Sequence, residues 1–115
     1  MHELGIARDF WATIKKIAEK SNLKEITKII IVVGEAAGVE IDFICHSLKS
    51  HILPGTIAEN AELEFLSVKL AARCNACSFE ITKENISGIF CPSCGSFDIN
   101  IVSGKEAYVH SIEGE

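Results

Sequence analysis

The sequence predicts an α+β fold with two helices, a small three-stranded sheet and an inserted zinc-ribbon-like β module. Three observations carry this prediction. An amino-terminal stretch repeats apolar residues at helical spacing, a β-branched run follows it, and two Cys-x-x-Cys pairs lie in the second half of the chain. We therefore expect residues 1–71 and 102–115 to form an α/β domain, with residues 72–101 as the inserted four-cysteine module.

Length and composition favour one compact domain with a small insert. The chain has 115 residues, of which 48% are hydrophobic, an ordinary share for a globular core. Its formal net charge of -5 argues against a protein held to nucleic acid by phosphate contacts. We see no signal peptide and no apolar run of membrane-spanning length. Five cysteines without such a signal indicate a reducing compartment, and we expect the cytoplasm.

The first helix is expected to end near Ser21-Asn22. Its lysines fall largely opposite an apolar stripe, which is the pattern of a helix packed on a core. The stripe consists of Leu4, Ala7, Phe10, Trp11, Ile14, Ile17 and Ala18. After it, Ile26–Val33 is a short β-branched run that predicts a buried strand ended by Gly34.

A second helix is predicted from Glu40 to about Ile52, before the break at Pro54-Gly55. Cys45 falls on its apolar face, so we expect a buried, inert thiol. His46 and His51 are five residues apart. An α-helix would place them too far around its axis to form a metal-binding pair, so both are expected at the surface.

The remaining strands are expected at Glu62–Leu70 and Lys105–Ile112, with His110 on the solvent face of the latter. Glu35 and Glu40 flank a loop that can approach the amino terminus. Glu40 then has two alternative roles, as an outer partner of a terminal metal or as a charge at a helix amino terminus.

The two cysteine pairs have the spacing of a four-thiolate metal site. A tetrahedral sulfur cage fits zinc best and iron second, and a closed cage favours a structural role. Gly95 suits the turn after the second pair because glycine tolerates positive φ, and Phe97 and Ile99 are expected to cover the metal. Unrelated core cysteines or two disulfides are the plain alternatives. The expected ligands are Cys74, Cys77, Cys91 and Cys94.

The amino terminus, Met1-His2-Glu3, is a second candidate metal site. The α-amine, the amide nitrogens of His2 and Glu3, and the His2 imidazole can place four nitrogens in a plane. That geometry suits Ni(II) or Cu(II) rather than zinc. A terminal histidine that is merely solvated is the alternative, and the residues alone do not choose between them.

Seven short motifs along the chain are informative when taken together. They are Met1-His2-Glu3-Leu4, Gly34-Glu35, Gly38-Val39-Glu40, Cys74-x-x-Cys77, Cys91-Pro92-x-Cys94-Gly95-Ser96, Gly104-Lys105-Glu106 and Ser111-Ile112-Glu113. In these motifs, and over essentially its whole length, the chain resembles the HypA family of hydrogenase nickel-incorporation proteins. It departs from that family's pattern at Ala36-Ala37 and at Cys45.

This resemblance implies a nickel metallochaperone and not an enzyme. Met1, His2 and Glu3 would hold Ni(II) as cargo, and the four cysteines would hold structural Zn(II). The implied partners are a HypB-like GTPase and the large subunit of a [NiFe]-hydrogenase, with urease maturation factors in some members. Neither nucleic acid nor membrane is an expected partner, and the chain is expected to be a monomer or a homodimer.

Two other functions stay open on the residues alone. A zinc-ribbon adaptor for protein or nucleic acid is one, although Arg73 and Lys83 are the only cations between residues 73 and 98 and make no basic patch. An iron-thiolate electron carrier is the other. We find no nucleophile–base set, phosphate loop or open metal site that would indicate an enzyme.

Overall fold

The computed structural model describes residues 2–86 and 88–115, with side chains from Leu4 onward. The chain divides into two compact units. The first unit contains Met1–Val32, Val39–Leu66 and Tyr108–Glu115, and the second contains Val33–Gly38 and Ser67–Ala107. The expected inserted segment, 72–101, therefore lies inside the second unit, which extends beyond it on both sides.

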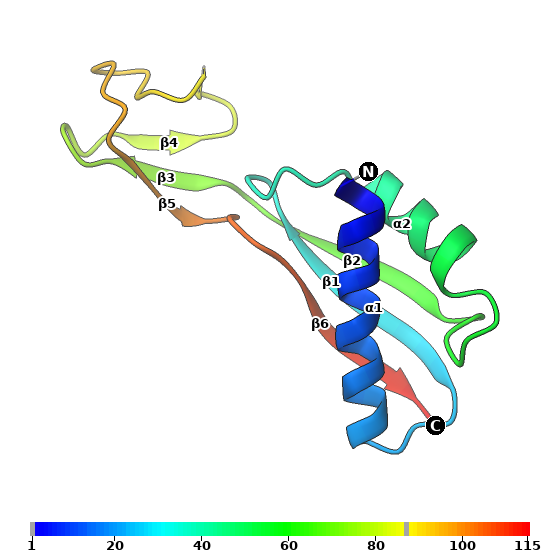
Figure 1. Ribbon diagram of the computed structural model, residues 1–115. Coiled ribbons are helices and arrows are strands. Elements are labelled where there is room, and N and C mark those ends of the chain that lie inside the picture. The colour runs from blue at the N-terminus through cyan, green and yellow to red at the C-terminus, as the bar shows by residue number, and fades with distance from the viewer. Residues whose placement is uncertain (1, 87) are drawn as a thin grey trace. The chain divides into compact units, whose positions relative to one another are not determined.

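The predicted three-stranded sheet is present, with strand order β2-β1-β6 (Figure 1). The helices of the first unit are close to their predicted positions. Its elements are α1 (His2–Lys20), β1 (Ile26–Gly34), α2 (Ile41–Ser47), the π-helix η1 (Leu48–Ile52), β2 (Glu62–Val68) and β6 (Ala107–Gly114). The three strands each continue for one or two residues into the second unit.

The helix α1 packs against α2 and η1. Of the apolar stripe predicted for it, Leu4, Trp11 and Ile17 are half-buried and the other residues are buried. The helix ends where Leu23 N–H donates to the Ala18 carbonyl at 3.0 Å, with Asn22 in the left-handed region at φ 55°. No helix among the described residues is long and apolar enough to cross a membrane.

The core of the first unit joins α1 and β1 to the second helical segment. Ile14 on α1 is fully buried, as are Ile29 and Ile31 on β1. Ile44 and Leu48 contribute from α2 and η1. Burying each such side chain stabilises the fold by about 1.5–3 kcal/mol, so this apolar layer is the main source of stability for the unit.

The second helical segment differs from the single α-helix expected from Glu40 to Ile52. Glu40 is the N-cap of α2 but makes no side-chain capping bond. The last five residues form the π-helix, which Leu53 N–H closes by donating to the Leu48 carbonyl at 2.8 Å. This wider turn brings the rings of His46 and His51 within 5.4 Å, so the expectation that they lie too far apart is wrong. Cys45 is half-buried rather than buried.

The second unit contains a small antiparallel sheet of order β4-β3-β5. Its strands are β3 (Ala71–Cys74), β4 (Glu80–Thr82) and β5 (Ile99–Ser103). Ala72 pairs with Ile81 on one side and with Ile101 on the other. A ribbon-like β module is therefore present.

A close backbone approach occurs within the second unit between Gly34 and Gly104. Ala36 N–H donates to the Gly104 carbonyl at 2.7 Å. A Cβ atom on Gly34 would overlap that carbonyl group. Only a residue without a side chain fits at this position, which explains the glycine that ends β1.

Candidate metal centre

Four cysteine side chains converge in the second unit. Cys74 ends β3, Cys77 lies in the turn toward β4, and Cys91 and Cys94 belong to the segment before β5. Their four sulfur atoms all lie within 4.8 Å of one another. The structure therefore brings together every cysteine predicted as a ligand of this site.

The spacing of the sulfurs fits one tetrahedral ion. The Sγ atoms of Cys74 and Cys94 are 3.6 Å apart, as are those of Cys77 and Cys91. Sulfurs 2.3 Å from a tetrahedral zinc would be about 3.8 Å apart, whereas a disulfide would need about 2.05 Å. The four cysteines are free thiols in the structure, so the alternative of two disulfides is wrong.

Each cysteine pair turns in the same way around the sulfurs. Ser78 N–H donates to the Cys74 carbonyl at 2.9 Å, and Gly95 N–H donates to the Cys91 carbonyl at 2.8 Å. Both donors have positive φ, 64° for Ser78 and 77° for Gly95. The glycine was expected in this role. Its counterpart Ser78 was missed, although it stands four residues after Cys74 just as Gly95 stands four after Cys91.

Backbone amides also point at the first sulfur of each pair. Ala76 N–H donates to Cys74 Sγ, and Ser93 N–H donates to Cys91 Sγ, both at 3.4 Å. Such bonds favour thiolates over thiols, as a metal-binding site requires.

The pKa values of Cys91 and Cys94 are shifted in opposite directions. Burial raises the pKa of Cys91, but N–H groups of Cys94 and Ser93 and bonds from neighbouring thiols outweigh it and lower the pKa to about 7. The N–H of Ser96 lowers the pKa of Cys94, but bonds to the other thiols and burial raise it to about 12. The cluster thus favours the thiolate at Cys91 over Cys94, and a bound cation would displace the thiol protons that remain.

A small cluster of buried side chains packs around the metal centre. Cys74 and Cys91 are fully buried, and Ile81 beside them is fully buried too. Ile99 packs against this cluster, as predicted, but Phe97 is 72% exposed, so its predicted covering role is wrong. Ile81 packs against the cysteines instead. It faces inward on β4 between exposed Glu80 and half-buried Thr82, an alternation that was not predicted from the sequence.

The predicted terminal nickel ligands fall at the start of α1. Met1 lies outside the described residues, and His2 and Glu3 are described by their helical backbone alone. The geometry of that set of ligands therefore stays a prediction. His110 is exposed on β6, as expected, with Nδ1 3.2 Å from Ser111 Oγ.

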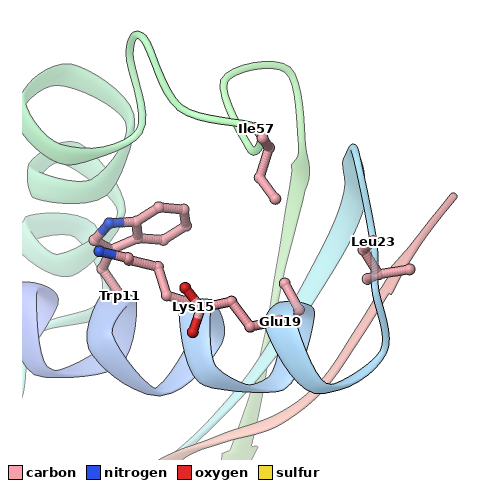
Figure 2. Close-up of a pocket in the computed structure, with 6 residues that line it drawn as sticks. Trp11, Lys15, Glu19, Leu23 and Ile57 are labelled. Carbon is pink, nitrogen blue, oxygen red and sulfur yellow. The ribbon is translucent and has the colours of Figure 1, made fainter.

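Two hollows open on the described part of the chain. Figure 2 shows the first, of about 210 Å³, where Trp11, Lys15 and Glu19 of α1 face Ile57. The second, of about 380 Å³, lies in the second unit and is lined by apolar residues. Neither contains histidine or cysteine, so the chemistry of these hollows differs from that of the sulfur cluster.

Comparison with known proteins gives a consistent family match. Residues 1–114 match the family model described as "Hydrogenase/urease nickel incorporation, metallochaperone, hypA". The hydrogenase maturation factor HypA of Aquifex aeolicus is 34% identical, over 100% of this chain and 98% of that protein. The factor of the same name from Francisella philomiragia is 35% identical, over 97% of each.

Solved structures match the fold. The solution structure of the Ni metallochaperone HypA from Helicobacter pylori has a TM-score of 0.69 at 19% identity, covering 97% of this chain and 96% of that one. A second solution structure of a HypA protein gives the same TM-score at 20% identity, covering 100% and 97%. The α+β fold with its ribbon-like module is therefore shared with these proteins.

Proposed function

Because the chain belongs to the HypA family of hydrogenase/urease nickel-incorporation metallochaperones, we propose that it binds one Ni(II) at its amino terminus and delivers it to the large subunit of a [NiFe]-hydrogenase. The observation that carries the proposal is the family match over residues 1–114, which includes the terminal Met-His-Glu. Delivery to urease is the alternative target.

The terminal site would use nitrogen ligands. We assign the α-amine of Met1, the amide nitrogens of His2 and Glu3, and the His2 imidazole, with the Glu3 carboxylate as an axial or outer partner. The start of α1 at His2 supports this assignment. The first N–H groups of a helix have no partner within it, so their deprotonation by nickel breaks no helical hydrogen bond.

A site at an exposed terminus suits a nickel ion that must be released to a partner. The positive end of the helix dipole opposes a cation by about 0.3–1 kcal/mol, and the negative charge of deprotonated amides offsets this. Copper(II) outcompetes nickel for such ligands, so selectivity would come from metal availability and docking to the partner.

The four-cysteine centre would hold structural zinc. Its spacing, its sulfur-directed amides and the absence of a position for substrate in a closed cage support this role. Iron is the alternative, and it would make an electron carrier. An iron–thiolate protein absorbs visible light and a zinc one does not, so the colour of the purified protein decides between them.

The partners would be those of hydrogenase maturation. We propose a HypB-like GTPase and the hydrogenase large subunit, with urease maturation factors as the alternative, in the cytoplasm and as a monomer or homodimer. The role requires no catalytic group and no nucleic acid. The scarcity of cations from Arg73 to Asp98 is consistent with a protein partner rather than a nucleic acid.

A transfer assay tests delivery directly. The chain, loaded with one equivalent of radioactive Ni(II), is mixed with nickel-free hydrogenase large subunit, the GTPase and GTP, with a chelator present to remove free nickel. We expect label in the large subunit with the native chain and little with His2→Ala. Equal transfer from both, or none from either, would contradict the proposal.

A further inference from the structure

Two histidines face each other on the exposed side of the second helical segment. His46 lies near the end of α2 and His51 lies in η1, and both are exposed. Their ring centroids are 5.4 Å apart, with ring planes 82° apart. We propose that His46 and His51 form a second metal site, which binds one divalent late-transition ion such as Ni(II) through two imidazoles, with water completing the coordination.

The conformation of the backbone brings the two histidine rings together. In a regular α-helix, residues at i and i+4 are neighbours, and i+5 lies further around the axis. The π-helical turn from Leu48 to Ile52, closed by the Leu53-to-Leu48 hydrogen bond, widens the step so that positions 46 and 51 meet. π-Helical turns are rare and are found frequently at functional sites.

The separation of the rings suits two ligands of one ion. Imidazole nitrogens bind at about 2.0–2.1 Å, which places the centroids of two rings on the same ion about 5 Å apart. The observed 5.4 Å is close to this separation, and rotations about the side-chain bonds of the two exposed residues can aim a nitrogen of each ring at one ion. The terminal ring torsion of histidine is soft, so these rotations cost little.

A neighbouring hydroxyl can orient one of the two rings. Ser50 Oγ lies 3.4 Å from His46 Nδ1, a long contact on the same exposed face. When Nδ1 carries the proton and donates it to this oxygen, the lone pair of Nε2 is left for a metal. Ser50 would then act as a positioning residue for His46.

The site would be open and exchangeable. Among the described residues, no third histidine, cysteine or carboxylate joins the pair closely enough to enclose an ion. Imidazole binds nickel, copper and zinc well, so the pair would accept the kind of ion that the terminus is proposed to carry. The site stands independently of the terminal one, since it uses different residues.

The test uses the full chain in a His2→Ala background, with one equivalent of zinc supplied for the cysteines. Ni(II) is titrated by calorimetry, while NMR follows paramagnetic broadening of the imidazole signals of His46, His51 and His110. We expect one further equivalent of Ni(II), with the signals of His46 and His51 broadening together. Circular dichroism checks that each variant keeps its helices.

His46→Ala and His51→Ala, made singly, should each weaken this binding by roughly two orders of magnitude, because the remaining imidazole loses its chelating partner. His110→Ala is the matched control, since it removes an exposed imidazole that pairs with no other ring among the described side chains, and it should change nothing. If all three variants bind alike, or if His110 broadens as much as the pair, the two rings make an aromatic contact only and the proposal is wrong.

Discussion

The carboxylate of Glu35 accepts a hydrogen bond from the backbone N–H of Leu70, with 2.7 Å between Oε1 and the nitrogen. The N–H of Glu35 donates in turn to the Val68 carbonyl at 2.9 Å. Nζ of Lys83 lies 4.0 Å from the other carboxylate oxygen, and the Glu35 side chain is 22% exposed. Glu35 therefore links the residues after β1 by hydrogen bonds to the segment between β2 and β3, which is a structural role within the second unit.

Removing the Glu35 carboxylate should destabilise the segment between β2 and β3. We expect Glu35→Ala to lower the free energy of unfolding by about 1–2 kcal/mol, because the Leu70 N–H loses a charged acceptor. Glu35→Gln keeps an acceptor oxygen and should cost less. Hydrogen exchange at the Leu70 amide checks the cause. Unchanged protection of that amide in Glu35→Ala would contradict this account.

The close approach of Gly34 to Gly104 predicts intolerance of any side chain. Gly34→Ala should destabilise the protein by about 1–3 kcal/mol, since its Cβ would overlap backbone atoms that cannot rotate away. Gly5→Ala is the matched control, because a Cβ there meets nothing within 4 Å. In the helix α1 it should stabilise by about 0.5–1 kcal/mol. Urea unfolding compares the two variants, and equal effects would contradict the geometry.

Removal of the metal should affect the second unit before the first. The cysteine module has few buried apolar residues, so metal binding, on the order of 10 kcal/mol for structural zinc, would supply much of its folding energy. Under a strong chelator we expect amide protection to be lost around Cys74 and Cys91. The single tryptophan, Trp11 on α1 in the first unit, reports the other part, and its fluorescence should stay unchanged. Simultaneous loss of both signals would contradict this expectation.

Acid should release the metal from the cysteines. The pKa of Cys91 is lowered from 9.0 to about 7, so its preference for the thiolate is fully expressed above its ordinary pKa and is lost as pH falls through the lowered value. Protons then compete with the metal for all four sulfurs. Measuring zinc bound per chain after dialysis should show loss from neutral to mildly acid pH. Retention of zinc independent of pH would overturn this.

Long periodic segments were predictable because one physical pattern dominates each. The apolar repeat of α1 and the β-branched run of β1 have the spacing of a buried helix face and of a buried strand, and both elements form almost where expected. The two cysteine pairs were equally informative, since metal ligation constrains their spacing more tightly than packing does.

The failures lie where residue types carry no signal of the local geometry. A π-helical turn shifts every later side chain around the axis, which is why the pairing of His46 with His51 was missed. In the cysteine module, strands of three to five residues are too short for periodicity to show which side chain faces inward, so Phe97 was chosen over Ile81. Left-handed backbone at Ser78 gave no signal in its residue type.

The central claim, nickel at the amino terminus, is tested most directly by titrating Ni(II) into three untagged proteins and following heat and d–d absorption. All three carry His46→Ala and His51→Ala, which remove the second proposed site. The first has no other change, the second adds His2→Ala, and the third has residues added before Met1. We predict about one equivalent in the first, with the absorption of a planar nitrogen site, and its loss in the other two. Equal binding in all three would contradict the terminal site.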